Sequence, residues 1–164
     1  MVGVEKIVVP GTNVLRRAGN TLIDTASSDE QKRDALQTLT YWRSLHIYPI
    51  DTFQKMLKRR CGQLRFKDST VAQRLKRMPS IISKLERFPQ MNLARMQDIG
   101  GIRVILPSIQ DVYKLHNDLT MINRRFSHIP KLPCDDYIKD PKKDGYRSVH
   151  QIFTYKSRDH AELD

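Results

Sequence analysis

The first residues in this sequence that could hold phosphates lie between Arg74 and Lys84. Read as a helix, this stretch starts two neighbouring basic rows at Arg74 and Lys76, with Ser80 and Lys84 along them. Arginine offers a planar fork of donors and lysine a compact charge, and both groups pair well with phosphate oxygens. The stretch therefore predicts a polyphosphate-binding helix, and the alternative is a solvated basic helix face.

A second group begins at Asp98, directly before an apolar run that contains Gly100 and Gly101. Glycines allow a ligand to approach the backbone closely. A carboxylate at a strand edge suits Mg²⁺, which proteins usually hold with one or two carboxylates plus substrate phosphates. Arg103 alternates onto a different face from its neighbours and could reach the same ligand. The alternative is a turn aspartate and a surface arginine.

A third group places cations beside an aromatic ring. Lys139, Lys142 and Arg147 surround Tyr146, and His150 follows on the same face if this segment is a strand. A ring can stack on a base while cations hold phosphates, so the pattern suits a phosphorylated ligand that contains a base. The alternative is an ordinary wet strand face beside a basic turn.

The elements that must position these groups begin with helices. Residues 1–28 predict a loosely structured arm, since they contain Pro10, Gly11 and Gly19. A capping-box pattern from Ser27 to Glu30 predicts a helix start at Ser27 or Ser28, and Pro49 predicts its end near Tyr48. A second helix should end at Gly62, and a third should run from Ser69 to Leu85 with a kink or break at Pro79.

The second half of the chain predicts two strands around a helix and a long loop. Residues 99–106 are apolar and β-branched and predict a buried strand, and 108–122 predict an amphipathic helix. Residues 123–145 predict a long polar loop, and 146–156 alternate as a strand does. The expected fold class is therefore α/β or α+β, with a sheet covered by helices.

The charge balance of the sequence limits the classes of partner that the protein could bind. The chain has 29 Lys+Arg against 18 Asp+Glu, a net charge of +11 and a pI near 9.9. This excess indicates nucleic acid, a polyphosphate nucleotide or another acidic surface as partner, or else a solvated basic face. Two isolated cysteines without zinc-ligand spacing, no leader and no membrane span predict a cytoplasmic, soluble protein. The sequence contains no P-loop motif.

Taken in order, the three groups resemble the synthetase domain of the RelA/SpoT family, and the Trp42-Arg43, His46 and Pro49 pattern resembles its stand-alone small members. The resemblance covers roughly residues 41–155. It rests on Arg74-x-Lys76 with Ser80-Ile81-x-x-Lys84, on Asp98-Ile99-Gly100-Gly101-Ile102-Arg103, on Asp136-Tyr137-Ile138 with Pro141-Lys142, and on Gly145-Tyr146-Arg147-Ser148-Val149-His150.

The resemblance implies a mixed sheet flanked by helices, similar to nucleotidyltransferases, in one domain at residues 29–164 behind the arm at 1–28. It implies that the catalytic residues are Asp98, Arg74 and Lys76, with Asp98 as the Mg²⁺ ligand. The ATP site would comprise Arg74, Lys76, Ser80, Lys84 and, packed on adenine, Arg103. The acceptor site would comprise Lys139, Lys142, Arg147, His150 and, stacked on guanine, Tyr146.

The implied reaction is that of a nucleotide pyrophosphokinase. The 3′-hydroxyl of GDP or GTP attacks the β-phosphorus of ATP, AMP leaves, and the product is (p)ppGpp. Two alternatives stay open: a toxin-type member that pyrophosphorylates the 3′ end of tRNA, which the net charge favours, and a catalytically dead fragment that binds nucleotide or RNA.

One departure from the family pattern matters. The family has a second essential acid, in a Glu-x-Gln-x-Arg-Thr strand beyond the Gly-Tyr-Arg-Ser segment. Here Glu162 is the sole nearby glutamate, no Gln-x-Arg-Thr follows it, and the sequence stops at Asp164. We therefore expect a domain that lacks its C-terminal part, with an exposed sheet edge and weak or absent turnover.

Overall fold

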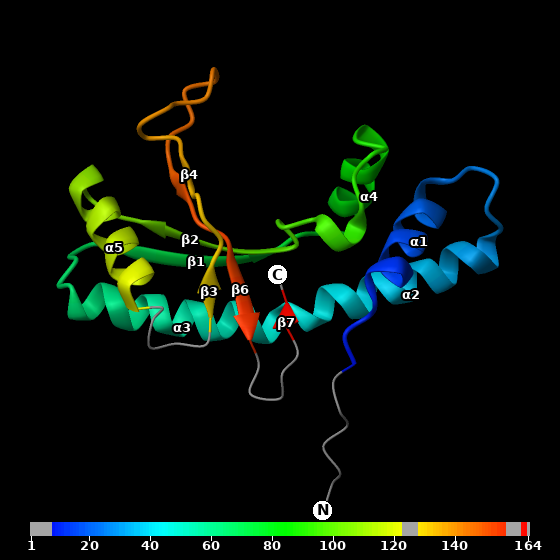
Figure 1. The fold of residues 1–164 in the computed structure, drawn as a ribbon, viewed down its shortest axis with the longest axis horizontal. Helices are drawn as coiled ribbons and strands as arrows, with labels where there is room; N and C mark the ends of the chain where they lie inside the picture. The colour runs from blue at the N-terminus through cyan, green and yellow to red at the C-terminus, as the bar shows by residue number, and fades with distance from the viewer. Residues whose placement is uncertain (1–7, 123–127, 157–161, 164) are drawn as a thin grey trace, which may run out of the picture. The chain divides into compact units, whose positions relative to one another are not determined.

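The computed structural model describes residues 8–122, 128–156 and 162–163, and Figure 1 labels its elements. The chain forms two compact units, which are described separately below. Unit 1 comprises Met1–Phe53 and Gln73–Ile102, and unit 2 comprises Gln54–Ala72 and Arg103–Asp164.

Unit 1 is mainly helical. Its helices are α1 (Thr12–Ile23), α2 (Asp29–Leu45), the first part of α3 (Ile47–Gln63) and α4 (Met78–Arg87), followed by the short 3₁₀ helix η1 (Leu93–Arg95). Helix α1 packs against α2, α4 and η1. Side chains from these elements form the buried core of the unit: Leu15, Leu39, Ile81, Leu85 and Leu93.

The N-terminal segment corrects one expectation. A loose arm was expected over residues 1–28, but Thr12–Ile23 within it form α1, whose Leu15 and Ala18 are buried. Gly19 does not loosen this helix, because its missing side chain leaves room for Leu93. Apolar contacts with the rest of unit 1 therefore outweigh the weak local helix signal.

The boundary between α2 and α3 follows the sequence closely. Ser28 caps α2, and its side chain and that of Gln31 form a capping box. His46 ends α2, and Pro49 stands in the first turn of α3, where its missing N–H costs no helical hydrogen bond.

Unit 2 contains helix α5 (Ile109–Ile122), which begins at a Ser108–Asp111 cap as expected. An ion pair between Arg60 and Asp118 joins the second half of α3 to α5, with Nε and Oδ2 2.8 Å apart. The rest of unit 2 contains short strands joined by longer connecting segments. They are β3 (Ile129–Pro130), β4 (Asp135–Asp136), β5 (Val149–His150), β6 (Phe153–Lys156) and β7 (Glu162–Leu163).

These strands form two small antiparallel sheets. The order β3–β6–β7 gives one sheet, in which Ile129 faces Thr154 and Tyr155 faces Leu163. Strands β4 and β5 pair with Asp135 opposite His150. The continuous strand predicted over residues 146–156 is therefore two strands, separated by Gln151 and Ile152.

A further pair, β1 (Thr70–Leu75) and β2 (Gly100–Ile105), begins in one unit and ends in the other. The helix predicted from Ser69 to Leu85 is therefore wrong in its first half, where β1 lies. Strand β2 has the predicted position but alternates between half-buried and exposed residues, so it is not the fully buried strand expected. The fold class, a mixture of helices and small sheets, agrees with the prediction. No helix in the described part of the chain is long and apolar enough to cross a membrane.

Candidate nucleotide-binding site

Lys76 lies immediately after β1, and its backbone is fixed on both sides. Its N–H donates to the carbonyl oxygen of Ile99 at 2.7 Å, and its own carbonyl accepts from Nε of Arg43 at 2.8 Å. The carbonyl of Lys76 is thus tied to helix α2 and its amide to the residue before β2. These bonds hold the start of the Lys76 side chain in place.

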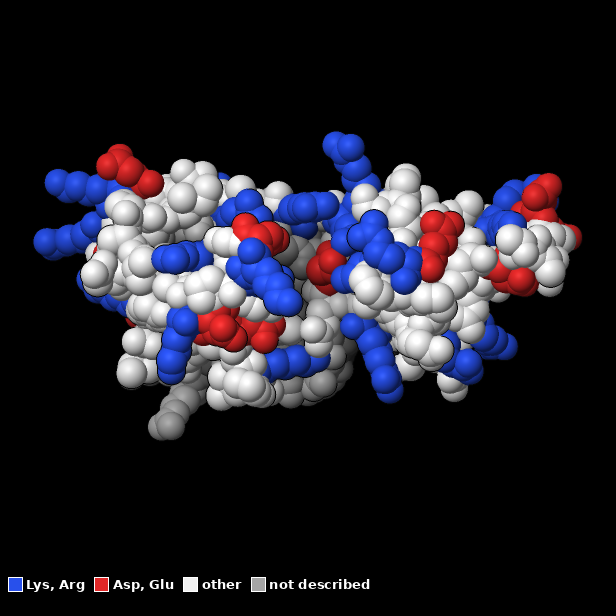
Figure 2. Space-filling model, turned by 90° about the horizontal axis from the view of Figure 1, so that it is seen from above, with Lys and Arg blue, Asp and Glu red and all other residues white. Residues whose placement is uncertain are grey.

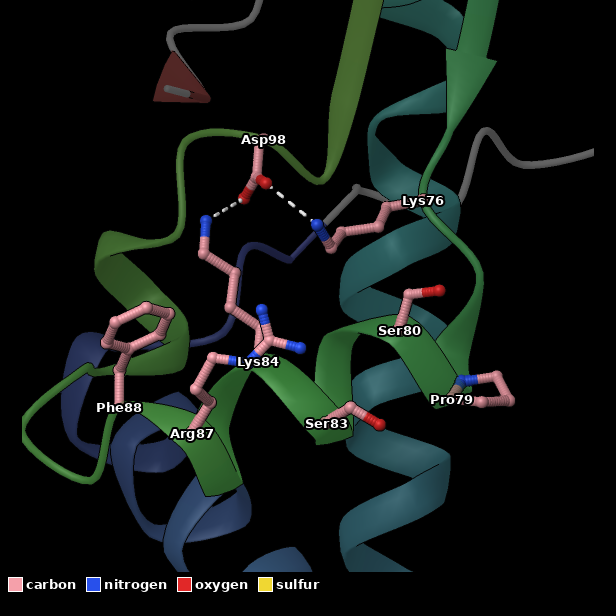
Figure 3. Close-up of a pocket in the computed structure, with 8 residues that line it drawn as sticks. All are labelled: Lys76, Pro79, Ser80, Ser83, Lys84, Arg87, Phe88 and Asp98. Atoms are coloured by element: carbon pink, nitrogen blue, oxygen red, sulfur yellow. Dashed lines mark hydrogen bonds and ion pairs between the residues drawn. The ribbon is translucent and has the colours of Figure 1, made fainter. Parts of the chain in front are cut away.

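The side chain of Lys76 meets two groups from other elements (Figure 3). Its Nζ lies 2.8 Å from Oδ2 of Asp98, and Nζ of Lys84 lies 2.8 Å from Oδ1 of the same carboxylate. The lysine side chains are 15% and 28% exposed and that of Asp98 is 48% exposed, so solvent reaches the carboxylate more easily than either ammonium group. One carboxylate therefore holds two lysines from different elements, one that follows β1 and one on helix α4.

This arrangement keeps Asp98 ionised. Partial burial acts to raise its carboxyl pKa, but the hydrogen bonds and positive charges of Lys76 and Lys84 outweigh that effect. The pKa of Asp98 consequently lies below its ordinary value.

Helix α4 provides one wall of the surrounding pocket. Ile81 and Leu85 are buried in the core of unit 1, so the opposite face of the helix points outward. Pro79 in the first turn suits the helix start. The pocket has a volume of about 500 Å³ and lies wholly within unit 1. Its lining residues are Lys76, Pro79, Ser80, Ser83, Lys84, Arg87, Phe88 and Asp98.

Unit 2 holds a separate aromatic cluster on the segment between β4 and β5. The hydroxyl of Tyr146 lies 2.8 Å from Nε2 of His150, and the ring of Tyr137 stands edge-on to both of their rings. Nζ of Lys142 lies 4.3 Å from the centre of the Tyr137 ring and 5.5 Å from that of Tyr146. Gly145, at a φ of +80°, closes the turn before Tyr146 in a conformation that favours glycine.

Asp136 fixes the start of this segment. One carboxylate oxygen accepts from the backbone N–H groups of Ile138 and Lys139, and the carboxylate also accepts from the hydroxyl of Tyr113 on α5. The hydrogen bond from Lys139, together with those from Tyr113 and Ile138, holds the pKa of Asp136 below its ordinary value. The turn is thus anchored to α5 by an ionised carboxylate.

The model of a region found in RelA / SpoT proteins matches residues 73–164, which contain both clusters. The chain belongs to the RelA / SpoT family. This result confirms the resemblance that the sequence motifs indicated.

Other proteins show further similarity to this chain. A GTP pyrophosphokinase of Haemophilus influenzae is 31% identical over 103 residues, which cover 55% of this chain and 13% of that protein. The crystal structure of small alarmone synthetase 2 from Bacillus subtilis matches with a TM-score of 0.59 and 24% identity, over 70% of this chain and 60% of that one. Small alarmone synthetase 1 of the same organism, bound to its product pppGpp, matches with a TM-score of 0.59 and 22% identity, over 76% and 69%. The chain thus spans only part of the Haemophilus protein's length, and the structural matches establish the fold.

The geometry brings together three of the residues predicted for the ATP site and the predicted Mg²⁺ ligand. Lys76, Ser80, Lys84 and Asp98 line one pocket, although Lys76 follows a strand and does not lie on the predicted basic helix. Arg74 is an exposed residue of β1 and is not among the pocket's lining residues. Arg103 lies on an exposed position of β2 and belongs to unit 2.

Four lining residues were not among the predicted site residues: Pro79, Ser83, Arg87 and Phe88. Ser83 and Arg87 could have been found, because they follow Ser80 at i+3 and i+7 and so lie on the same face of a helix. Nothing in the sequence separates Phe88, which is 49% exposed, from an ordinary surface phenylalanine.

The two glycines after Asp98 have a different role from the one expected. A Cβ at Gly100 would lie 2.5 Å from Cδ1 of Ile50, so this glycine allows β2 to pack against α3 within unit 1. A Cβ at Gly101 would meet nothing within 4 Å. Close packing, rather than the approach of a ligand, therefore explains Gly100.

In the acceptor segment, the structure confirms the predicted proximity of Lys142, Tyr146 and His150. Lys139 and Arg147 are exposed. Tyr137 is part of the same cluster and was not among the predicted site residues. Tyr137 follows β4 directly, and its contacts with Tyr146 and His150 depend on the later turn at 142–145, which the Asp136-Tyr137-Ile138 motif does not reveal.

The residues at Asp98 fit a magnesium ion that arrives with a nucleotide. Among the described residues, no group of three or more His, Cys, Asp or Glu side chains could hold a metal ion by itself. A single carboxylate is enough for Mg²⁺ when substrate phosphates supply further ligands. Both oxygens of Asp98 are engaged by lysines, however, so a metal ion must compete with them.

Positive charge is widespread on the face that Figure 2 shows, with acidic side chains between the Lys and Arg side chains. This distribution agrees with the net charge of +11. Such a surface attracts polyanions over distances longer than a direct contact.

Proposed function

We propose that the chain is the nucleotide-binding part of a GTP pyrophosphokinase, and that the unit 1 pocket binds the phosphates of ATP. The observation that carries the proposal is the pair of ammonium groups, from Lys76 and Lys84, brought together in one pocket of a RelA / SpoT family member. The Haemophilus relative bears the name of that enzyme, which supports the proposed reaction.

On the donor side, the work of the protein is to position and neutralise phosphates. Lys76 and Lys84 would bind phosphate oxygens, with Arg87 and the hydroxyls of Ser80 and Ser83 along the same wall. Phosphoryl transfer spreads negative charge over the phosphoryl oxygens, and fixed cations stabilise that charge without rearranging. Arg74 and Arg103 are proposed for ATP as well, with Arg103 packed on adenine.

Asp98 would hold Mg²⁺. The ion would supply neutralisation of the phosphate charge and help to orient the nucleotide. The residues of the chain would then do the rest: Asp98 orients the ion, and the lysines released from Asp98 turn to the phosphates.

On the acceptor side, the ring of Tyr146 would stack on guanine, with Lys142, Lys139 and Arg147 as phosphate partners and His150 orienting the tyrosine hydroxyl. The 3′-oxygen of GDP or GTP would form a bond to the β-phosphorus of ATP. The bond from that phosphorus to the oxygen that leaves with AMP would break, and the acceptor hydroxyl would lose its proton to solvent water. The free thiols Cys61 and Cys134 fit the reducing cytoplasm that supplies both nucleotides.

Calorimetric titration with Mg-ATP tests the donor proposal. Replacing Lys84 by Gln, or Lys76 by Gln, should weaken binding about tenfold, since each removes a charge-assisted contact of about 1.5–3 kcal/mol. Lys32→Gln, the same change on α2 of unit 1, should leave the affinity within twofold, because Lys32 is half-buried and is not among the residues that line the pocket. Equal weakening by Lys32→Gln, or no weakening by either pocket variant, would refute the donor site.

The net charge of +11 favours a second acceptor, the 3′ end of tRNA. Labelled ATP offered with GDP, GTP or tRNA shows which acceptor receives the pyrophosphoryl group. Binding of tRNA should fall steeply with salt, because neutralised phosphates release counterions. Transfer to guanosine nucleotides alone would exclude the tRNA alternative.

A further inference from the structure

Asp98 pairs with Lys76 and Lys84, the two side chains proposed to bind the phosphates of ATP. Both carboxylate oxygens accept from the lysines proposed for ATP, and this pairing is complete without any ligand. We propose that Asp98 makes the pocket selective for metal-complexed ATP, because its carboxylate competes with phosphate for Lys76 and Lys84 until a divalent cation binds it. This inference rests on the proposed ATP site and adds a selection step to it.

The argument begins with charge. Two ammonium groups face one carboxylate, so the ligand-free pair of contacts already neutralises half of the lysine charge. A metal-free triphosphate that takes over the lysines leaves the carboxylate next to phosphate oxygens without a cation. The negative carboxylate and the negative phosphate would repel each other, and this repulsion is stronger where water is partly excluded than in bulk water.

A divalent cation removes this conflict. With the ion on Asp98, the carboxylate has a new positive partner, and the ammonium groups of Lys76 and Lys84 are free for phosphate. The ion also neutralises phosphate charge, so the same triphosphate that was repelled as a free anion is attracted as a complex. The metal and ATP therefore strengthen each other's binding, and thermodynamic linkage requires the effect to be reciprocal.

The geometry permits the exchange without backbone movement. Asp98 is half exposed, so an ion can reach its oxygens from solvent, whereas the ammonium groups sit on flexible four-carbon stems. The backbones of both lysines are fixed. Two hydrogen bonds hold the backbone of Lys76, and Lys84 is part of helix α4. The change is confined to side-chain rotation within one pocket (Figure 3).

The test measures ATP affinity by calorimetry with EDTA and again with excess Mg²⁺. Asp98→Asn keeps the shape of the side chain and removes its charge. With EDTA it should bind ATP about tenfold more tightly than the wild-type chain, within the range typical of coupling between sites, and it should lose the gain that Mg²⁺ gives the wild type. Glu86→Gln is the matched control, because it removes the same charge from an exposed position of α4 outside the pocket lining. It should change the ATP affinity neither with EDTA nor with Mg²⁺.

A second variant separates competition for lysine from a general loss of negative charge. In a Lys84→Gln background one of the contested contacts is absent, so the gain from Asp98→Asn in EDTA should shrink. Lys84→Gln alone frees one oxygen of Asp98, and Mn²⁺ binding without nucleotide, followed by electron paramagnetic resonance, should become stronger than in the wild type.

The outcomes separate this inference from the proposed function. A wild-type chain that binds ATP in neither condition refutes the ATP site itself. A wild-type chain that binds Mg-ATP, together with an Asp98→Asn variant whose EDTA affinity is unchanged or weaker, leaves the ATP site standing and refutes the competition. A full gain in the Lys84→Gln background, or unchanged Mn²⁺ binding, would also contradict it.

Discussion

At the residue scale, burial and neighbouring lysines shift the pKa of one titratable group in each cluster, an acid in the first and a base in the second. Asp98 is stabilised as an anion by Lys76 and Lys84, whereas the pKa of His150 is lowered, which favours its neutral form. Partial burial, and after it the positive charge of Lys142, lower the pKa of His150 below its ordinary value. A neutral His150 can accept the hydrogen bond from the hydroxyl of Tyr146, which fixes the ring proposed to stack on guanine.

Titration of His150 by NMR tests this environment. We expect a midpoint below the ordinary histidine pKa, and we expect Lys142→Gln to raise it, because the variant removes a cation that opposes protonation. Since the folded-state pKa is depressed, the corresponding stability is complete above the ordinary pKa of about 6.5 and decreases as the pH falls below it.

Lys131→Gln is the matched control for this titration, since Lys131 belongs to the same unit and is not among the groups that shift His150. A His150 midpoint that is raised by Lys131→Gln and unaffected by Lys142→Gln would contradict the assigned electrostatics.

At the element scale, the site depends on where β1, α4 and β2 begin and end. Strand β1 ends just before Lys76, and β2 starts two residues after Asp98. Lys84 lies on helix α4, which connects these two regions of the chain. The position of β2 depends in turn on Gly100, which allows close contact with Ile50 on α3. An element boundary, rather than a continuous basic helix, therefore brings the charged groups together.

Replacing Gly100 by Ala tests that dependence. The added methyl group would overlap Ile50, and overpacking of this kind costs about 1–3 kcal/mol in the free energy of unfolding, measured with urea. Gly101→Ala is the matched control on the same strand, where a Cβ meets nothing, and it should change stability little.

The double variant Gly100→Ala with Ile50→Val should recover part of the lost stability, because Val lacks the Cδ1 atom that the new methyl group meets. Equal effects of the two single glycine variants would show that close packing is not the reason for Gly100.

The same elements show how far sequence reasoning reaches. The capping box at Ser28, the start of α5 at Ser108 and the strand after Asp98 follow from local side-chain chemistry, and the structure confirms each within a residue or so. Strand β1 was missed because Val71 and Leu75 happen to fit the helical spacing that continues into α4. Pro79 held the corrective signal, since a proline within a helical pattern can mark its first turn.

The candidate site was predictable to a similar degree. Residue type and order were sufficient to find Lys76, Ser80, Lys84 and Asp98, because each is close to others in a recognisable motif. The contact of both lysines with one carboxylate was not predictable, since it depends on the return of the chain from α4 through η1 to β2. Likewise, the place of Tyr137 depends on a turn that only the folded chain defines.

At the scale of the whole molecule, each compact unit holds one cluster: the lysine–aspartate pocket in unit 1 and the aromatic cluster in unit 2. The proposed function assigns ATP to the first cluster and the guanosine nucleotide to the second. Since the family match covers residues 73–164, it includes the whole aromatic segment and all the residues that line the pocket.

The most direct measurement follows the side-chain ¹⁵N signals of the lysine ammonium groups while Mg-ATP is added. The account predicts that Lys76 and Lys84, immobilised by Asp98 beforehand, give distinct signals that shift together on titration, while the signal of Lys32 stays in place. It also predicts that Asp98→Asn alters both signals before any nucleotide is present. If ATP binds and leaves the Lys76 and Lys84 signals unmoved, the nucleotide lies elsewhere and the central claim is contradicted.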